Sequence, residues 1–575
     1  MLFTKIKNLD RNTKKNFIVL FFLSLIFTAI ETLSIGIIVP FINSFVNQDF
    51  IKEFIILEYL LDFFYPENIF NFFSIELSKE NKNIIAFTII LVVIYFIKSL
   101  FVLFYHLFSI NFLMGLQKDL SNLLYRHYLK KDYLHFILLR SSTIFRLVIV
   151  DTGLFISGLR AILDLFVGIL TIIILVIFLF KVNFSITLYS ILIFFLLSFI
   201  YLKFVKKKII NYSDTRILAE ENRIKQLNEG LNMFKQIKLR NKIDYFFKIF
   251  DAENSKFTDS LIKFEFLGKA PKILLEFLGV FFIFFVVLYL VIMKNSTNEV
   301  LIILGTISVI FVRLLPLINR FVYDIQLLNW SKSVLNSYPL EGKSVKSILI
   351  EQNNFEKNIV FEKKIKFYDV SFFYKDRDLV ILDKINFEIN KGEYIGIKGS
   401  TGTGKSTILD LIMGLISPSS GEIKIDEKNL EINNRNWHEK IGYVPQDVTL
   451  ISENILKNIA FGVEEKEIDM QKINKCVEIA NLSEFINQLP NKFETNIGHM
   501  SSNISGGQKQ RIGIARALYH DPEILIFDEA TNSLDEKTEQ QILNLIKKLK
   551  GEKTIIFVSH QTNPLKYCDK IIDLK

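Results

Sequence analysis

The sequence predicts a two-part chain: a membrane all-α domain with six transmembrane helices, followed by an α/β nucleotide-binding domain of the P-loop type. Half of the 575 residues (50%) are hydrophobic and 56 are Phe, and the mean hydropathy is +0.32. Soluble proteins rarely reach these values. The apolar runs lie in the first part of the chain, whereas strand and helix patterns alternate around a phosphate-binding loop in the last part.

The boundaries follow from where these patterns change. The transmembrane domain is expected at residues 1–337, a polar linker at 338–358 and the nucleotide-binding domain at 359–575. The six spans are expected at 17–45, 84–114, 145–180, 184–204, 271–293 and 299–320. Spans four and five are expected to continue as charged helices that meet in a turn at 233–241. Residues 50–73 fit either a short surface helix or a plain loop.

Charge and cysteine usage predict where the two domains lie. A net charge of +9 would suit a nucleic-acid-binding protein, but Lys and Arg cluster beside the apolar runs. Such clusters are typical of the cytoplasmic flanks of membrane helices, so no nucleic acid partner is expected. Cys476 and Cys568 form neither a disulfide framework nor a metal-binding spacing. The nucleotide-binding domain is therefore expected in the cytoplasm.

A phosphate-binding loop is the strongest motif of the chain. It consists of Gly399, Ser400, Thr401, Gly402, Thr403, Gly404, Lys405, Ser406 and Thr407, which fit the pattern G-x-x-x-x-G-K-[ST]. An apolar strand candidate at 394–397 precedes it and an apolar helix candidate at 408–415 follows, which disfavours a Gly-rich turn without a ligand. Lys405 is expected to reach the β- and γ-phosphates of ATP, and Ser406 to hold Mg²⁺.

Further candidate residues stand at the ends of predicted strands and at a helix start. Gln446 follows a strand and can ligate Mg²⁺ and orient water. The Ser-Gly-Gly sequence at 505–507 opens a helix and offers free N–H groups to a phosphate. Asp528 ends a buried strand and is expected to bind Mg²⁺, whereas Glu529 polarises the attacking water. His560 ends another strand, at the edge where open α/β sheets bind ligands.

Taken in order, these motifs make the whole chain resemble an ATP-binding cassette (ABC) transporter of the exporter type. The resemblance implies an ATP-binding set made of Tyr374 (stacking on adenine), the loop 399–407, Ser505, Gly506, Gly507, Gln508 and Asp535. It implies a catalytic set of Glu529, His560 and Gln446, and a metal set of Ser406, Gln446 and Asp528. The chain departs from the family at Gly498-His499-Met500-Ser501, where a charged stretch is usual.

The same resemblance implies how the chain works. Two cassettes enclose two ATP molecules, each between the P-loop of one chain and the signature sequence of the other, which is Ile504–Gln508 in this chain. One chain carries one complete motif set, so a homodimer with ATP and Mg²⁺ as cofactors is expected. Closure of the cassettes turns the membrane helices outward, and hydrolysis resets them. Contacts at 130–138 and 233–241 are expected to transmit this motion.

Ionisable residues inside the spans are candidates for substrate contacts. Four cations, Lys98, Lys272, Arg313 and Arg320, predict an anionic substrate head group. Glu31 and Glu276 are the alternative partners for them. Asp151, Arg160 and Asp164 are instead expected to pair with one another at helical spacing.

The segments 31–42, 270–272 and 313–320 resemble the bacterial flippases for lipid-linked oligosaccharides. In that group, basic residues at the four cation positions face the pyrophosphate of the lipid carrier. The resemblance implies a multi-pass protein of the bacterial inner membrane that moves a polyprenyl-pyrophosphate-linked oligosaccharide, or a related membrane lipid, to the outer leaflet. A multidrug or general lipid exporter is the alternative. The 15 residues before span one leave no room for the protease domain of many peptide exporters, and the six spans exclude a soluble cassette protein.

Overall fold

The computed structural model divides the chain into two compact units. Residues 1–130 and 139–351 form the first, and residues 131–138 join 352–575 in the second. The structure describes residues 11–37, 79–182, 184–292, 297–337, 359–374, 380–400, 402–497, 504–531, 534–560 and 562–574. The segments 50–73, 338–358 and 498–501, for which the sequence suggested a surface helix, a linker and an unusual loop, lie outside this set.

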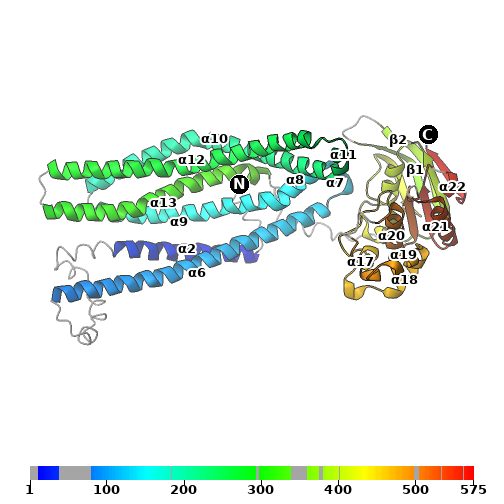
Figure 1. Cartoon of the computed structure of the whole chain (residues 1–575), viewed down its shortest axis with the longest axis horizontal. Coiled ribbons are helices and arrows are strands. Elements are labelled where there is room, and N and C mark those ends of the chain that lie inside the picture. Colours follow the sequence, from blue (N-terminus) through cyan, green and yellow to red (C-terminus); the bar gives the residue numbers. More distant parts are fainter. Residues whose placement is uncertain are drawn as a thin grey trace. The chain divides into compact units, whose positions relative to one another are not determined.

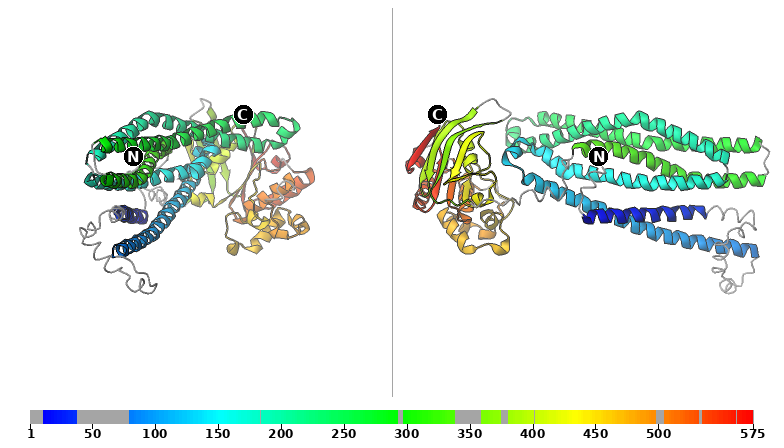
Figure 2. Two further views of the ribbon diagram at one scale, coloured as in Figure 1. Left: turned by 60° about the vertical axis from the view of Figure 1, so that its left-hand side comes forward. Right: turned by 180° about the vertical axis from the view of Figure 1, so that it is seen from behind.

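The described part of the first unit consists of helices, most of them long. They are α2 (Arg11–Gly36), α6 (Lys79–Leu129), α8 (Ser141–Phe145), α9 (Asp151–Val182), α10 (Phe184–Asn232), α11 (Phe234–Leu239), α12 (Ile243–Ile292) and α13 (Thr297–Ser337). Helices α9, α10, α12 and α13 lie side by side, and α2 packs against α6 and α9 (Figures 1 and 2). A π-helical turn, Arg146–Val150, joins α8 to α9.

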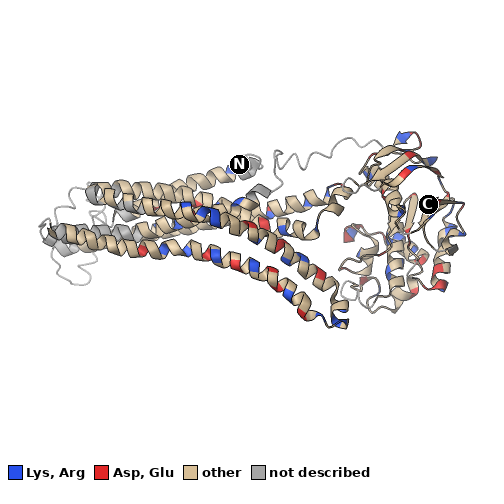
Figure 3. Cartoon of the chain, turned by 90° about the horizontal axis from the view of Figure 1, so that it is seen from above, with Lys and Arg blue, Asp and Glu red and all other residues tan. Residues whose placement is uncertain are grey.

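Four helical runs in the described part of the chain are long and apolar enough to cross a membrane: Lys14–Ser34, Phe87–Leu129, Ser141–Ile177 and Ile243–Tyr289. The other two expected spans coincide with stretches of α10 and α13. Helices α10 and α12 have 49 and 50 residues. A bilayer core needs only about 20. Their charged residues gather along one half of their length (Figure 3), and α11 lies between them at the expected turn.

A proline inside α12 ties three helices together. Pro271 has no N–H group, so the carbonyl of Leu267 lacks its usual partner four residues ahead. The hydroxyl of Tyr201 in α10 donates to this carbonyl oxygen at 2.5 Å, and Nε2 of Gln326 in α13 donates to it at 3.2 Å. The carbonyl freed by the proline is thus satisfied by two neighbouring helices.

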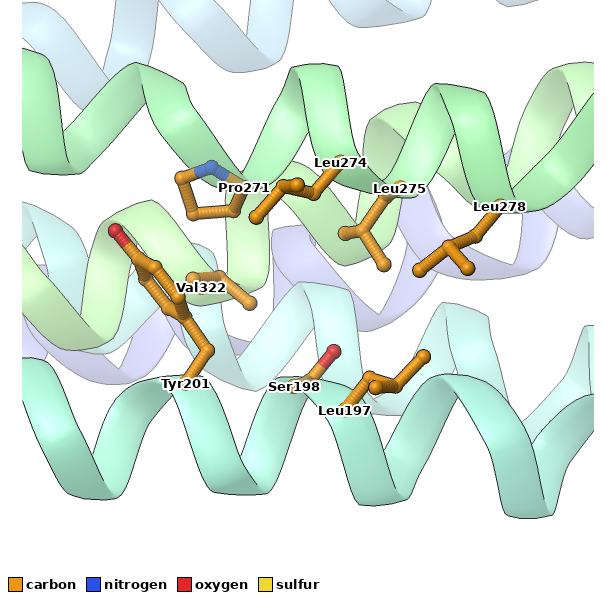
Figure 4. A pocket seen from close by; sticks show the side chains of 8 residues that line it. All are labelled: Leu197, Ser198, Tyr201, Pro271, Leu274, Leu275, Leu278 and Val322. Atoms are coloured by element: carbon orange, nitrogen blue, oxygen red, sulfur yellow. The ribbon is translucent and has the colours of Figure 1, made fainter.

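A small apolar cavity of about 160 Å³ lies beside this proline. Its walls come from α10, α12 and α13 (Figure 4): Leu197, Ser198, Tyr201, Pro271, Leu274, Leu275, Leu278 and Val322. The hydroxyl of Ser198 is buried and makes no hydrogen bond to the described residues. Apart from this hydroxyl and that of Tyr201, the lining consists of apolar side chains, so the cavity suits an apolar group.

The second unit contains two sheets. An antiparallel sheet has the order β2 (Val380–Asn390), β1 (Lys364–Phe373), β4 (Ser420–Ile425) and β5 (Lys428–Asn429). A parallel sheet has the order β6 (Ile441–Val444), β7 (Ile524–Asp528), β8 (Thr554–Val558), β3 (Tyr394–Gly399) and β9 (Lys570–Leu574). Every residue of β8 is buried, as expected for a central strand of a parallel sheet covered on both faces.

Short helices surround the parallel sheet. They are α7 (Tyr133–Leu138), α15 (Lys405–Ile412), α16 (Arg435–His438), α17 (Ile455–Ile459), α18 (Met470–Ile479), α19 (Ser483–Gln488), α20 (Gly506–Tyr519), α21 (Glu536–Lys548) and α22 (Thr562–Leu565). Trp437 is fully buried and donates from Nε1 to the carbonyl oxygen of Ile412 at 2.8 Å. This bond anchors the end of α15, the helix that follows the P-loop.

Candidate functional site

The P-loop joins β3 to the N-terminus of α15. Gly402 and Gly404 have φ angles of +91° and +86°, a region that favours glycine. A Cβ at Gly404 would also lie 2.8 Å from Leu382. Helix α15 has Gly404 at its N-cap and no side-chain cap. The first N–H groups of the helix are therefore left to a ligand, as in an anion-binding helix terminus.

Lys405 is the buried cation of this loop, with a side chain 8% exposed. Its Nζ donates to the carbonyl oxygens of Gly399 at 2.8 Å and Ser400 at 3.3 Å. It also lies 2.6 Å from Nε2 of His560 and 3.7 Å from Oε1 of Glu529. A phosphate at the helix N-terminus would bring a stronger anionic partner to the same ammonium group.

Glu529 occupies a strained backbone position directly after β7. Its φ of +50° is rare for a residue with a side chain, and its N–H donates to the carbonyl oxygen of Val558 at 3.0 Å. Nε2 of Gln446 donates to its Oε2 at 3.1 Å, while its Oε1 lies 2.8 Å from Nε2 of His560. Three predicted catalytic residues from the ends of β6, β7 and β8 thus meet at one edge of the sheet, with Lys405 beside them.

Asp528 lies next to Glu529 and is held by a residue that the sequence reasoning missed. The hydroxyl of Tyr443 in β6 donates to Oδ2 of Asp528 at 3.2 Å. Burial raises the pKa of Asp528, while the bond from Tyr443 opposes this shift. Burial also raises the pKa of the neighbouring Asp410 to about 6, with a further contribution from the charge of Asp528. No motif in the sequence signals this contact, because it depends on the register in which β6 and β7 pair.

The residues of the signature cap their own helix. Oγ of Ser505 accepts from the N–H of Gln508 at 3.2 Å, and Oε1 of Gln508 accepts from the N–H of Ser505 at 3.0 Å. This reciprocal capping box starts α20. Asp535 caps α21 in a similar way, because its Oδ2 accepts from the N–H of Thr538 at 3.0 Å. Their expected contacts with ATP remain predictions.

The remaining P-loop and adenine residues are placed as follows. Ser406 lies exposed in the first turn of α15, and Thr407 is buried. Thr401 lies outside the described residues. Tyr374 directly follows β1, is half-buried and meets the ring of Phe372 edge-on at 5.1 Å between centroids. Its stacking on adenine remains a prediction.

Residues 131–138 dock on the nucleotide-binding domain. Nδ2 of Asn433 donates to Oδ1 of Asp132 at 2.7 Å. The side chains of Tyr133 and Leu134 pack against the hydrophobic core of this domain. Burial raises the pKa of Tyr133, and the charges of Asp410 and Asp528 add to the shift. This segment, expected to transmit motion, therefore lies near Asp410 and Asp528.

Asp151 and Asp164 form ion pairs within the chain, as expected, but the expected partners at helical spacing among Asp151, Arg160 and Asp164 are wrong. Asp151 instead lies 3.6 Å from Nη1 of Arg146, and Asp164 lies 2.9 Å from Nη2 of Arg320 in α13. The π-helical turn before α9 and the packing of α9 on α13 supply these partners. Spacing along one helix cannot reveal a partner on another helix.

The four candidate substrate cations are not all free. Lys98, with a side chain 10% exposed, lies 2.9 Å from Glu31 and donates to Oγ of Ser34 at 2.9 Å. Lys272 lies 3.8 Å from Glu276, and Arg320 contacts Asp164 and, at 4.0 Å, Asp324. The side chain of Arg313 is outside the described part. The carboxylates that were the alternative partners thus do contact Lys98 and Lys272.

Comparison with known families decides the identity of this two-domain arrangement. Residues 16–315, just over half of the chain, match the ABC transporter transmembrane region, and residues 382–532 match the ABC transporter domain. The chain belongs to the ABC transporter family. It carries one transmembrane domain of the exporter type and one ATP-binding cassette, so it is a multi-pass membrane protein with half of the usual domain complement.

Individual relatives cover only part of this ABC transporter. It is 39% identical over 209 residues to the leukotoxin translocation ATP-binding protein of Mannheimia glucosida, covering 36% of this chain and 29% of the relative. It is 35% identical over 213 residues to the ATP-dependent lipid A-core flippase of Ralstonia nicotianae, covering 37% and 36%. The chain thus aligns with about a third of the length of these relatives.

The fold extends over the whole chain. The structure of a bacterial Atm1-family ABC exporter with ATP bound superimposes with a TM-score of 0.77, covering 98% of this chain and 94% of that one at 19% identity. This likeness concerns the fold alone.

The donor set at the sheet edge fits Mg²⁺ bound together with a nucleotide. Ser406, Gln446 and Asp528 offer oxygen atoms, which Mg²⁺ prefers. Within the described ranges, no group of three or more His, Cys, Asp or Glu side chains is arranged to hold a metal by itself.

Proposed function

We propose that this ABC transporter hydrolyses ATP as a homodimer and flips an anionic, lipid-linked substrate across the bacterial inner membrane. The substrate we favour is a polyprenyl-pyrophosphate-linked oligosaccharide, moved from the cytoplasmic to the outer leaflet, with the cassettes in the cytoplasm. The observation that carries the ATPase part is the meeting of Glu529 Oε1 with His560 Nε2 at 2.8 Å beside Lys405.

The roles of the residues follow from their positions. Glu529 holds and polarises the attacking water, and Gln446 orients its carboxylate from the other oxygen. Lys405 and His560 stabilise the charge on the transferred phosphoryl group. Ser406, Asp528 and Gln446 would hold Mg²⁺, which would supply positive charge next to the phosphate oxygens. Hydrolysis by this set powers the change of the membrane helices.

The substrate part rests on the cations of the transmembrane domain and on the resemblance of their segments to lipid-linked oligosaccharide flippases. The side chain of Arg320 is 52% exposed although it contacts Asp164. Some N–H donors of its guanidinium group are therefore accessible to a phosphate group. Lys272 forms a 3.8 Å pair with Glu276, and both side chains are more than half exposed. Exposed pairs of this kind contribute little and exchange readily.

A multidrug or general lipid exporter remains the second candidate, and one observation favours it. The charge of Lys98 is already balanced by Glu31 at 2.9 Å, and Arg320 has Asp164 and Asp324 nearby. A substrate anion would have to compete with these carboxylates. The two candidates therefore differ in whether the cations serve the substrate or only their intramolecular partners.

Paired substitutions distinguish these roles. We expect Lys98→Met and the charge-balanced Lys98→Met/Glu31→Gln to be equally slow in flipping a fluorescent polyprenyl-pyrophosphate oligosaccharide in proteoliposomes. Arg313→Ala/Arg320→Ala should be slow as well, with basal ATPase activity near wild type because the cassettes are unchanged. Recovery of flipping in Lys98→Met/Glu31→Gln, or wild-type flipping by the arginine double variant, would show that the cations are structural. ATPase stimulation by drugs but not by this lipid would favour the second candidate.

A further inference from the structure

Tyr443, on the strand next to β7, holds one oxygen of the Asp528 carboxylate. Strands β6 and β7 are parallel neighbours, and Tyr443 lies opposite Ile526 in their register. From there the phenol hydroxyl reaches Asp528, the last residue of β7, and donates to Oδ2 at 3.2 Å. The bond thus links the ends of two adjacent strands at the edge where the catalytic residues meet.

Packing of the core does not require this hydroxyl. Gly442 and Val444, on either side of Tyr443, are buried, and Val444 is 0% exposed. Tyr443 itself is 38% exposed, in keeping with the alternation of side chains along a strand. A phenylalanine ring would cover the same neighbours. Any effect of removing the oxygen therefore reports on the bond to Asp528.

The phenol acts as a donor near neutral pH. A tyrosine hydroxyl ordinarily has a pKa of about 10, so it carries its proton there. A protonated phenol that donates to Oδ2 restricts rotation of the carboxylate and leaves the second oxygen, Oδ1, for another partner. Gln446, only three residues beyond Tyr443 in the chain, holds Glu529 in the same way.

We propose that Tyr443 is a positioning residue for metal binding, because its hydroxyl holds the Asp528 carboxylate in the orientation that presents Oδ1 to Mg²⁺ or to a metal-bound water. This proposal rests on the proposed ATPase function. Groups that orient metal ligands typically change metal affinity by about 10- to 100-fold. Because Tyr443 is a neutral donor that is partly exposed, we expect the lower end, about 10-fold.

The test compares Tyr443→Phe with a matched control, Tyr368→Phe, in the full chain in lipid. Tyr368 lies on β1 and is 40% exposed. The ammonium group of Lys366 lies over its ring, in a cation–π contact. The first measurement is the Mg²⁺ concentration that gives half-maximal ATPase activity. The second is Mn²⁺ binding in the presence of ATP, followed by electron paramagnetic resonance in the Glu529→Gln background, where nucleotide persists. Thermal unfolding and ATP binding in EDTA are measured alongside.

We expect Tyr443→Phe to need about 10-fold more metal in both measurements, with unchanged ATP binding in EDTA and unchanged unfolding, and Tyr368→Phe to match the parent protein. Equal Mn²⁺ affinity in Tyr443→Phe and the parent protein would overturn the proposal. So would an equal loss of ATP binding in EDTA, because the hydroxyl would then serve the nucleotide pocket in general. If the wild type binds Mn²⁺ with ATP in a Tyr443-dependent way but hydrolyses no ATP, the proposed function fails and this inference stands.

Discussion

The side-chain amide of Asn433 donates to the carboxylate of Asp132 at 2.7 Å, although the two residues are 301 positions apart in the chain. Asp132 directly precedes α7, the short helix whose Tyr133 and Leu134 pack against the nucleotide-binding domain. Asn433 adopts a φ of +55°, a conformation that asparagine tolerates better than most residues. This polar contact therefore helps to hold the segment 131–138 on the nucleotide-binding domain.

We expect Asn433→Asp to uncouple transport from ATP hydrolysis, since two carboxylates would then face each other. Asp132→Asn is the matched control because its Oδ1 still accepts the bond from Asn433. Transport in proteoliposomes and substrate-stimulated ATPase activity should fall in Asn433→Asp, while basal ATPase activity stays within about twofold, in line with a contact worth about 1 kcal/mol. Wild-type transport by Asn433→Asp would contradict a role in coupling.

Glu529→Gln should retain ATP binding and lose hydrolysis by about 100-fold or more, because an amide cannot accept the proton of the attacking water. Glu523→Gln makes the same chemical change at a surface carboxylate that pairs with Lys391 and Lys440. Steady-state ATPase activity of the purified proteins checks both, and the control should stay near wild type. Near-normal turnover by Glu529→Gln would contradict the assignment of Glu529 as the residue that accepts the proton of the attacking water.

A homodimer with composite sites predicts complementation. A chain with Lys405→Ala has a defective P-loop, and a chain with Gly506→Arg has a defective signature. Each alone should be inactive, whereas a mixed dimer regains one intact site, formed by the good P-loop of one chain and the good signature of the other. Co-expression with two affinity tags and ATPase assay of the doubly tagged dimer checks this. An inactive mixed dimer, or native mass spectrometry showing an obligate different partner, would argue against it.

The bond from Tyr201 to the Leu267 carbonyl should depend on Pro271. Tyr201→Phe removes one donor and should destabilise the protein by about 1 kcal/mol. In a Pro271→Ala background the new N–H at 271 can bond the same carbonyl, so the same substitution should cost less. A double-mutant cycle of apparent melting temperatures in detergent measures the difference. Equal shifts in both backgrounds would mean that Tyr201 acts through packing alone.

The sequence predicted which cassette residues come together, because they follow strands whose order places them at one edge of the sheet. Their roles in ATP binding and hydrolysis stay predictions. The ends of β6, β7 and β8 meet next to the loop after β3, so Gln446, Glu529, His560 and Lys405 could be placed by motif and strand order alone. Tyr443 escaped notice because a tyrosine in a strand has no motif. Its role depends on the distance to Asp528, which only the register of the two strands sets.

Ion pairs in the transmembrane domain were harder to predict. The sequence offered Glu31 and Glu276 as alternative partners for the four cations without assigning pairs, and Lys98 and Lys272 contact them. It missed Asp164 with Arg320, because these residues lie on α9 and α13 and only the packing of those helices brings them within 2.9 Å. A 3.6-residue period describes one helix and carries no information about the neighbour it packs against.

The π-helical turn at 146–150, between α8 and α9, contains one residue more than an ordinary α-helical turn. A turn of this type closes over five residues instead of four, and it brings Arg146 within 3.6 Å of Asp151, five positions ahead. Deleting one residue inside 146–150 could therefore be absorbed as an ordinary α-turn, with α9 keeping its orientation. A deletion inside 152–163 cannot be absorbed in this way, because that segment is already an ordinary α-helix. It would rotate Asp164 by roughly 100° relative to α8, away from Arg320. Length variation among natural relatives should accordingly be tolerated in the first segment and excluded from the second.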